Sequence, residues 1–565
     1  MDRDIRKKVT ALIAAVMLTA CASGSDTAPA GTAGADVAPV TDSAADNSAA
    51  DSSTTVAASE DAPDETDTAE DGGIKAVFGE IRTEFATVDL SDYPLTPSDV
   101  PEGYSEIFEA ESGTVSGNVY VSEREEASGG AYVSGLNVEG DRLDIPVTVG
   151  YDGAYDINVL TGAASEGREN YVLVDGEQVG TILTTGMSPE FEGSVLYDIY
   201  LTKGEHTISL EPYWGYIEID CVELRAPEHP ITADTYKVKQ DLSNANADEH
   251  TRALYKFLSD IYGKYSLAGQ YAEKGRESSE FTKIKAKTGK EFAVLGLDMS
   301  GYSLCSQGPG SGSKSVEYAY DWYNNAGGIV QLCWHWTSPD KYVKSGQPWY
   351  SSFYADSSDI DLDAVMNGQD EECYQLLMDD IDNMSDELAR LRDAGVPVLW
   401  RPLHEASGGW FWWGDCQPET YKKLWNVMYD KMTNEHGLTN LIWVWNGQSP
   451  DWYPGDETVD IVGWDIYAGK RVDSSQAGRF ADMAVNYGDT TKLIALTENG
   501  CVMDPDKVMR DNARWLFWGT WSDPFTMKLG VVVNDEYTTY ELLEKAYCHD
   551  RVLTLDELPD LKNYK

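Results

Sequence analysis

The sequence predicts an α/β protein in which a β-sandwich precedes a (β/α)8 TIM barrel. Three observations support this prediction. The 565 residues are more than one hydrophobic core usually serves. Residues 104–226 alternate apolar and polar side chains with a period of two, and glycine-containing turns separate the stretches. From residue 245 onward, apolar strand-like runs alternate with amphipathic helical patterns.

The first twenty residues have the pattern of an export signal. Several basic residues stand before position 9, and residues 9–18 form an apolar run that is too short to span a membrane. The following "LTAC" resembles a bacterial lipoprotein signal, which implies cleavage before Cys21 and lipidation of its thiol. The alternative is an ordinary secretory signal. Either way we expect an exported protein, held at the cell surface if Cys21 carries lipid.

Residues 21–103 are expected to form a disordered linker. The stretch 22–72 holds small and acidic residues without Lys or Arg, so it cannot bury enough apolar surface to offset the entropy of ordering. The formal net charge of the whole chain is −53. Such an acidic protein is poorly suited to nucleic acids and to anionic membrane surfaces, and a neutral substrate fits better.

The predicted sandwich, residues 104–226, contains stretches such as "AYVSGLNV", "YDINVLTG" and "NYVLVDGEQVG". Turns recur there about every eight to twelve residues, as is typical of a jelly-roll-like sandwich. A proline-punctuated linker, residues 227–244, then leads into the predicted barrel, residues 245–565.

Eight strands are expected in the barrel, with amphipathic helices at 373–395 and 419–437. The strands are 265–271, 292–299, 328–336, 396–405, 441–446, 459–467, 492–500 and 514–521. A doubly wound open sheet is the alternative, but no glycine-rich phosphate turn follows the first strand. The pattern therefore favours the barrel.

Polar residues gather where these strands end, which is where TIM barrels carry their reactive groups. His335 ends the third strand, His404 and Glu405 end the fourth, Tyr467 ends the sixth, and Glu498 ends the seventh. Two glutamates that face each other across a barrel mouth suit a glycosidase. One protonates the leaving oxygen, and the other attacks the anomeric carbon.

Residues 245–565 resemble glycoside hydrolase family 26, whose members are mostly retaining endo-β-1,4-mannanases. The resemblance rests on "GGIVQLCWHW", "VPVLWRPLHEASGGWFWWG", "NLIWVWN", "YPGDETVDIVGWDIY" and "ALTENG". It implies that Glu405 is the general acid/base and Glu498 the nucleophile. The expected partners are β-mannan polysaccharides, and no cofactor is expected for catalysis. Some family members cleave mixed-linkage β-glucan or β-1,3-xylan, and these substrates stay open as alternatives.

The same resemblance implies substrate-binding roles for six further residues. They are His335, Arg401, His404, Trp410, Tyr467 and Trp521. Arg401 and Tyr467 would keep the nucleophile ionised through hydrogen bonds. The position of Trp521 depends on alignment, because Trp515 and Trp518 offer alternative registers. Trp412 and Trp413 are as consistent with packing as with outer sugar sites.

The sandwich resembles family 35 carbohydrate-binding modules. The similar motifs are "IFEAESG", "SGGAYVSGL", "YDINVLTG" and "WGYIEIDCVEL", although family 6 modules share much of this pattern. The resemblance implies a structural Ca²⁺ held by Glu109, Glu111 and Asp220, with solvated acidic side chains as the alternative. It also makes Trp214 a candidate to stack on the ligand of the module, or else a packed residue.

The eight cysteines and seven histidines show no Cys-x-x-Cys or His-x-x-x-His spacing, so neither zinc nor a disulfide framework is predicted. We expect a monomer. A second class of function is a non-catalytic glycan-binding lipoprotein on a degenerate barrel, which the two intact glutamate motifs argue against.

Overall fold

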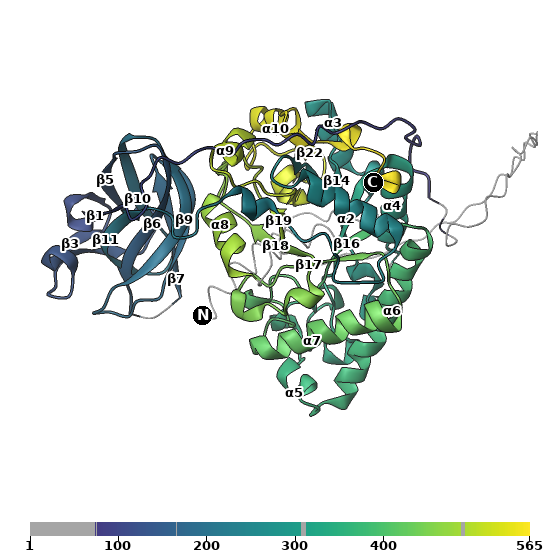
Figure 1. Ribbon diagram of the computed structural model, residues 1–565. Coiled ribbons are helices and arrows are strands. Elements are labelled where there is room, and N and C mark those ends of the chain that lie inside the picture. Colours follow the sequence, from purple (N-terminus) through teal and green to yellow (C-terminus); the bar gives the residue numbers. More distant parts are fainter. Residues whose placement is uncertain (1–73, 75, 165–166, 307–311, 488–491) are drawn as a thin grey trace, which may run out of the picture.

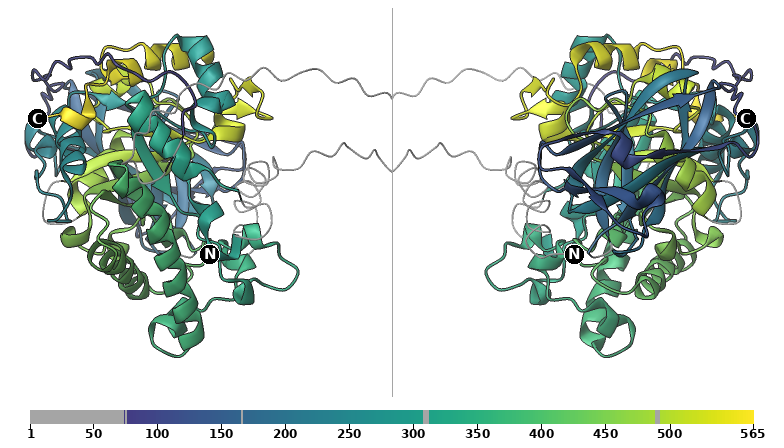
Figure 2. Two further views of the ribbon diagram at one scale, coloured as in Figure 1. Left: turned by 90° about the vertical axis from the view of Figure 1, so that its right-hand side faces the viewer. Right: turned by 90° about the vertical axis from the view of Figure 1, so that its left-hand side faces the viewer.

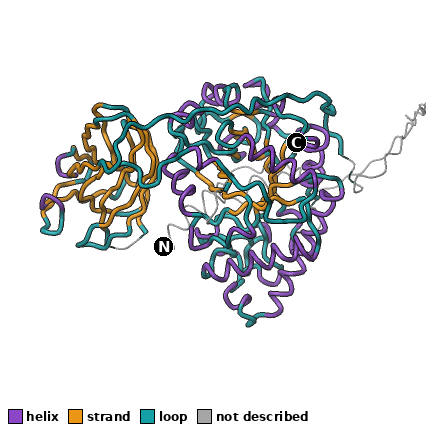
Figure 3. Tube along the Cα trace, in the orientation of Figure 1, coloured by secondary structure: helices purple, strands orange, loops and turns teal. Residues whose placement is uncertain are grey.

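The computed structural model describes residues 74, 76–164, 167–306, 312–487 and 492–565. The export signal, Cys21 and the acidic stretch 22–72 lie outside the described residues. The chain forms two lobes, one built mainly of strands and one in which helices surround strands (Figures 1 and 3). Within the described ranges, no helix is both long enough and apolar enough to cross a membrane.

The first lobe is a sandwich of two antiparallel sheets, as predicted. One sheet has the order β3-β4-β11-β6-β9, with β1 also beside β11, and the other has the order β2-β5-β10-β7-β8. The strands are β1 (Ser105–Glu109), β2 (Thr114–Ser116), β3 (Tyr120–Glu123), β4 (Ala131–Leu136), β5 (Arg142–Val149), β6 (Gly153–Gly162), β7 (Arg168–Val174), β8 (Glu177–Thr184), β9 (Glu192–Leu201), β10 (Gly204–Trp214) and β11 (Ile217–Arg225).

Period-two alternation places the apolar side chains between the two sheets. In β5, Leu143, Ile145, Val147 and Val149 are all buried, whereas the residues between them are partly or fully exposed. Side chains of successive strand residues point to opposite faces, so this sequence can cover only one face with apolar groups.

The second lobe is a closed barrel of eight parallel strands, which rules out the doubly wound alternative. Gln270 of β13 pairs with Thr520 of β20 and closes the ring. The barrel strands are β13 (Gly269–Tyr271), β14 (Val294–Asp298), β15 (Ile329–Cys333), β16 (Val398–Arg401), β17 (Leu441–Trp445), β18 (Ile461–Ile466), β19 (Leu493–Asn499) and β20 (Trp518–Thr520).

Every barrel strand is shorter than the apolar run that predicts it. The run 265–271 divides into β12 (Ser266–Leu267), which pairs with β23 (Val552–Leu553), and β13. The last predicted strand keeps only Trp518–Thr520 as a barrel strand, although the preceding Leu516 and Phe517 still form backbone hydrogen bonds with Ile494 and Leu496 of β19. Apolar runs therefore mark burial here more reliably than strand length.

Helices surround the barrel (Figure 3). They are α2 (Glu249–Ile261), α3 (Ser279–Thr288), α4 (Ser315–Tyr320), α5 (Leu362–Met366), α6 (Glu371–Asp393), α7 (Pro418–Asp430), α8 (Ala477–Asn486), α9 (Pro505–Arg510) and α10 (Tyr540–Tyr547). The long α6 illustrates why they form. The Asp370 carboxylate caps its first turn, Arg390 and Arg392 lie in its last turn, and one face of the helix is buried.

Residues 76–103 run across the barrel lobe before they enter the sandwich (Figure 1). The Arg82 Nη1 atom donates to the Leu555 carbonyl at 2.5 Å. The buried Arg514 Nη1 atom donates to the Tyr93 carbonyl at 2.9 Å. The expectation of a disordered linker up to residue 103 needs correction for this part, because the Arg82 side chain donates to a carbonyl of the barrel and the Tyr93 carbonyl accepts from a barrel side chain. We call residues 76–103 the strap.

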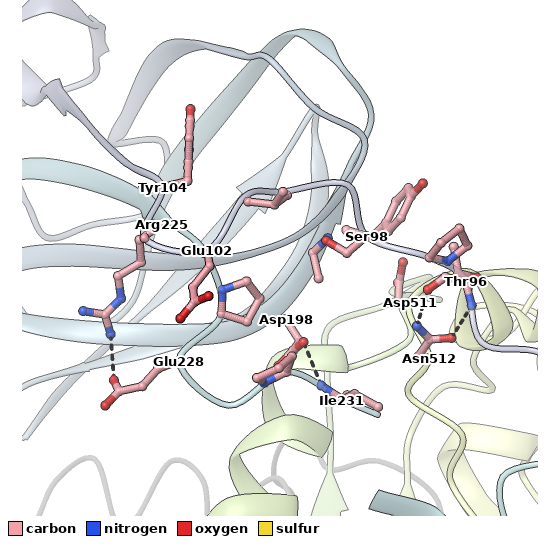
Figure 4. A pocket seen from close by; sticks show the side chains of 18 of the residues that line it. Thr96, Ser98, Glu102, Tyr104, Asp198, Arg225, Glu228, Ile231, Asp511 and Asn512 are labelled. Atoms are coloured by element: carbon pink, nitrogen blue, oxygen red, sulfur yellow. Dashed lines mark hydrogen bonds and ion pairs between the residues drawn. The ribbon is translucent and has the colours of Figure 1, made fainter. Parts of the chain in front are cut away.

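The two lobes contact each other, and α8 packs against β9 (Figures 1 and 2). An ion pair of 3.1 Å between Lys507 and Glu177 spans this junction. A cavity of about 750 Å³ lies where strap, sandwich and barrel meet (Figure 4). There the Ile231 amide donates to the Asp198 carboxylate at 3.2 Å. All seven cysteines in the described ranges are free thiols.

Candidate active site

Glu405 and Glu498 lie at the same mouth of the barrel. Glu498 is the next-to-last residue of β19, and Glu405 follows the end of β16. One carboxylate oxygen each of Glu405, Asp465 and Glu498 lie within 4.8 Å of one another. Retaining glycosidases hold their two carboxyl groups about 5–5.5 Å apart, whereas inverting enzymes need about 6.5–9.5 Å to admit a water. The spacing therefore fits a retaining reaction.

Glu498 is held by two donors. The Arg401 guanidinium donates to its Oε1 atom, and the Tyr467 hydroxyl donates to its Oε2 atom at 2.5 Å. Arg401 is completely buried and also donates to the Asp465 carboxylate at 2.9 Å. Asp465 in turn accepts 2.7 Å hydrogen bonds from Asn446 and Thr497. This network fixes the nucleophile candidate in one orientation and favours its ionised form.

The two glutamates have different electrostatic surroundings. Burial raises the pKa of the Glu405 carboxyl well above its usual range, and the Asp465 and Glu498 carboxylates raise it further. Burial also raises the pKa of Glu498, to about 7, whereas the Arg401 guanidinium acts in the opposite direction. Of the two glutamates, only Glu498 hydrogen-bonds to the Arg401 guanidinium. The first proton of the pair is therefore lost from Glu498, and Glu405 stays protonated. Opposite protonation states are what an acid and a nucleophile require.

The turn that presents Glu405 is strained. Leu403 and Glu405 have φ angles of 51° and 54°. These lie in the left-handed region, which residues other than glycine rarely adopt. The Glu405 amide donates to the Asn446 carbonyl at 2.6 Å. The Trp410 Nε1 atom donates to the Glu405 Oε2 atom at 2.9 Å. Tertiary contacts therefore hold the acid candidate in a conformation that its own backbone disfavours.

Both histidines of the mouth are buried. The His335 Nδ1 atom lies 2.8 Å from the Asp298 Oδ2 atom, and its Nε2 atom lies 3.2 Å from the His404 Nε2 atom. Burial, Arg401 and His335 hold the pKa of His404 well below its usual range. Both nitrogens of His335 have a partner, whereas the buried His404 Nδ1 atom has none among the described residues. A direct hydrogen bond from His335 to a sugar would require one of these contacts to break.

Some of the predicted tryptophans lie at the site, and the others are buried in the core. Trp410 and Trp521 are partly exposed, and the Trp521 ring lies 4.6 Å from the Tyr271 ring and 6.0 Å from the His335 ring. Trp412 and Trp413 are buried, as are Trp515 and Trp518. Since Trp521 directly follows β20, it is the tryptophan of its segment that reaches the mouth. Trp410 and Trp521 can form two walls of a sugar site.

Several residues of the site escape sequence reasoning. The Tyr271 hydroxyl accepts hydrogen bonds from Arg401 at 3.0 Å and from Gln331 at 2.7 Å. Asp298 holds His335, and Asn446 holds the turn of Glu405. Each of them ends or follows a barrel strand, so strand ends are the signal that could have found them.

Two of the three predicted metal ligands of the sandwich, Glu109 and Asp220, share Ser128 as a hydrogen-bond partner. The Ser128 hydroxyl donates to Glu109 at 2.8 Å, and the Ser128 amide donates to Asp220 at 2.8 Å. Burial raises the pKa of Asp220, and the Glu109 and Glu111 carboxylates add to this effect. The buried Oε2 atoms of Glu109 and Glu111 have no hydrogen-bond partner among the described residues. Such unpaired carboxylate oxygens are suitable ligands for a hard cation.

Trp214 ends β10 and is partly buried. The Arg168 guanidinium lies over its ring, 4.7 Å from the ring centre. One face of the indole is therefore covered by a cation, and a ligand that stacks on Trp214 must use the other face or displace Arg168.

Two protein families match this chain. Residues 243–555 match the family described as glycosyl hydrolase family 26, and residues 106–227 match the carbohydrate binding module of family 35. A mannan endo-1,4-β-mannosidase of Thermothelomyces thermophilus is 36% identical over 82% of this chain and 92% of that protein. Mannan endo-1,4-β-mannosidase B of a Piromyces species is 32% identical over 80% of this chain and 77% of that protein.

Solved structures agree with this assignment. A GH26-CBM35 β-(1,4)-mannanase of Podospora anserina is 33% identical, covers 82% of this chain and all of its own, and superposes with a TM-score of 0.55. A ruminal GH26 endo-β-1,4-mannanase is 26% identical over 82% of this chain and 99% of its own, with a TM-score of 0.56. The family match covers more than half of the chain and includes the whole carboxylate site. This chain is therefore a member of glycosyl hydrolase family 26 that carries a family 35 carbohydrate-binding module ahead of its barrel.

Proposed function

We propose that this protein is a retaining endo-β-1,4-mannanase that cleaves internal bonds of mannan, galactomannan or glucomannan. The observation that carries the proposal is the Glu405–Glu498 pair, whose oxygens lie within 4.8 Å and whose surroundings favour opposite protonation states. Family membership and the mannanase names of the similar proteins supply the substrate class.

The reaction is a double displacement. Glu498 attacks the anomeric carbon and forms a covalent glycosyl-enzyme, while Glu405 gives its proton to the glycosidic oxygen that leaves. Glu405 is then a carboxylate, and it takes a proton from the water that attacks the same carbon. This water displaces Glu498 and regenerates both starting protonation states. Configuration is retained because the carbon is inverted twice.

Trp410 and Trp521 contribute the walls of the cleavage subsite. A pyranose ring that stacks on indole buries apolar C–H groups, and aromatic stacking of this kind is worth about 1–3 kcal/mol for a nucleic-acid base. Because Trp410 also donates to Glu405, it couples the position of the sugar to the position of the acid.

Parallel assays on linear mannan, galactomannan, lichenan and β-1,3-xylan test the substrate. We expect reducing ends to form on the mannans and a ladder of oligosaccharides to accumulate. Cleavage of lichenan or β-1,3-xylan alone would contradict the mannanase assignment, and mannobiose as the sole product would contradict endo action. A protein that binds mannan without cleaving any of these substrates would instead be a glycan-binding lipoprotein.

The sandwich is proposed to bind carbohydrate and to hold a structural Ca²⁺ through Glu109, Glu111 and Asp220. The support is the pair of buried, unpaired carboxylate oxygens on Glu109 and Glu111, whose charges a divalent cation would neutralise. EDTA should lower the melting temperature of the sandwich, and added Ca²⁺ should restore it. The variant Glu111→Gln should melt at the same temperature with and without EDTA. An unchanged wild-type melting temperature would contradict the metal site.

We also propose that the protein is exported and anchored through lipid on Cys21. The support is the basic start, the short apolar run 9–18 and the "LTAC" motif. Labelling with a palmitate analogue in a bacterial host should mark the wild type and leave Cys21→Ser unlabelled. Equal labelling of both proteins would contradict lipidation at Cys21. Light scattering of the processed protein tests the expected monomer.

A further inference from the structure

A line of hydrogen bonds joins three neighbouring strands at the barrel mouth. Asp298 ends β14, His335 follows β15, and His404 follows β16. The Asp298 Oδ2 atom lies 2.8 Å from the His335 Nδ1 atom, and the His335 and His404 Nε2 atoms lie 3.2 Å apart. The next residue along the chain is the acid candidate, Glu405. Asp298 is thus connected to the acid without touching it.

The contacts of Asp298 fix where the proton of His335 lies. The Ser300 and His335 amides both donate to the Asp298 Oδ1 atom, at 2.9 and 3.2 Å. A carboxylate that accepts two amides is held ionised, so it can only accept at Oδ2 as well. The His335 Nδ1 atom must therefore be the protonated one.

This assignment also constrains the contact between the histidines. Two Nε2 atoms 3.2 Å apart can share only one proton, because one of them has to accept. The Nδ1 atom of His404 is buried and has no hydrogen-bond partner among the described residues. Among the described residues, His335 is therefore the hydrogen-bond partner that orients the His404 ring. The ring of His335 is itself enclosed by Phe353 and Phe411, at 5.1 and 5.5 Å between ring centres.

His404 stands in the middle of the strained turn. Its neighbours Leu403 and Glu405 both have left-handed backbone angles, so the turn depends on outside contacts. The backbone has three of these contacts. The Tyr421 hydroxyl donates to the Leu403 carbonyl at 3.1 Å, Trp413 to the His404 carbonyl at 2.8 Å, and the Glu405 amide to the Asn446 carbonyl at 2.6 Å. The His404 side chain links the turn to His335, which follows β15, and through His335 to Asp298 of β14.

We propose that Asp298 is a positioning residue for the acid/base. Its carboxylate holds His335 in the Nδ1-protonated form, and the His335–His404 contact carries this constraint to the turn that presents Glu405. Both nitrogens of His335 have a partner in this line, and the predicted contact of His335 with the sugar stays a prediction. The inference rests on the proposed glycosidase function.

The variant Asp298→Asn tests this line with little change in shape. Its amide nitrogen would donate to the His335 Nδ1 atom, which must then give up its proton, and the proton between the two histidines would reverse its direction. We expect kcat/KM on mannan to fall about 10- to 100-fold, by analogy with the loss of a carboxylate that orients a metal-binding histidine.

The leaving group separates positioning of the acid from a general structural effect. Dinitrophenolate departs without protonation, so release from 2,4-dinitrophenyl β-mannobioside in the pre-steady-state burst does not need Glu405. We expect Asp298→Asn to slow this burst less than about 3-fold. Equal losses on mannan and on the aryl substrate would overturn the proposal. Failure of the wild type to cleave either substrate would instead contradict the proposed function.

A matched control and a spectroscopic readout complete the experiment. Asp380 is also an aspartate of the barrel lobe, although it is more deeply buried than Asp298. Its carboxylate accepts from the Leu304 amide at 2.9 Å and from the Trp336 indole at 2.7 Å, and neither partner is a histidine. The variant Asp380→Asn should affect both substrates alike. Histidine ¹⁵N spectra of the wild type should show a protonated Nδ1 on His335, whether or not Asp298→Asn folds. A bare Nδ1 on His335 would overturn the proposal.

Discussion

The hydroxyl of Tyr467 offers a direct test of how the nucleophile is kept ionised. It donates to the Glu498 Oε2 atom at 2.5 Å, while its ring packs against Phe525 with 5.0 Å between ring centres. The variant Tyr467→Phe removes the hydroxyl and keeps the ring. Any change in the pH dependence of the reaction can then be attributed to one hydrogen bond.

The expected size follows from the charge of the acceptor. A hydrogen bond to an ionised group contributes about 1.5–3 kcal/mol, and one pKa unit corresponds to about 1.4 kcal/mol. Burial already raises the pKa of Glu498 to about 7. Loss of a donor to the ionised form raises the pKa again, so the acidic limb of kcat/KM should move to higher pH by about 1–2 units. Activity is therefore lost first at low pH.

The assay is the initial rate at low substrate concentration between acidic and weakly alkaline pH. The two limbs belong to the Glu405–Glu498 pair, and the acidic limb reports its first ionisation. The control is Tyr271→Phe, because the Tyr271 hydroxyl bonds to Arg401 and has no hydrogen bond to Glu498. An acidic limb that stays in place, or moves to lower pH, in Tyr467→Phe would refute the reasoning.

Three further changes test other parts of the site. Glu498→Ala should lower kcat on mannan by about 10⁴-fold or more while the melting curve is retained, and wild-type turnover would show that another residue is the nucleophile. Arg401→Met leaves the Asp465 and Glu498 carboxylates buried without a cation, and urea unfolding should show a loss of about 3–5 kcal/mol. A loss below about 1 kcal/mol, as for an exposed pair, would argue against this role. Trp410→Phe removes a donor to Glu405, so the pKa of this acid rises and the basic limb should move to higher pH by about one unit. A basic limb at lower pH would contradict that sign.

The order of elements in the barrel could be predicted because period and burial are local properties of the sequence. The run 441–446 predicts β17 within one residue, and the strand-end motif "ALTENG", which contains Glu498, predicts the place of Glu498 at the mouth. The length of β20 could not be predicted, since Trp515 is as apolar as Trp518 and only the packing of the whole lobe decides which of them joins the sheet.

The side-chain network of the site was less accessible to sequence reasoning. Asp298 is an ordinary strand-end aspartate until β14 and β15 pair and bring it to His335. The strap was missed for a similar reason. Its residues have no helical or strand periodicity. Arg82 donates hydrogen bonds to carbonyls more than 470 positions away, so the local sequence does not reveal these contacts.

The strap also determines how mechanical load would pass through the molecule. A pull on the chain ahead of residue 76 would first reach the contacts of Arg82 and Arg514 with the barrel. The sandwich lies beyond these attachment points along the chain, so such a pull would be carried by the barrel and would not stretch the junction between the lobes. Drag from an insoluble polysaccharide held by the sandwich would load that junction instead. The strap and the sandwich would therefore transmit tension from different directions, and the catalytic barrel would carry both loads.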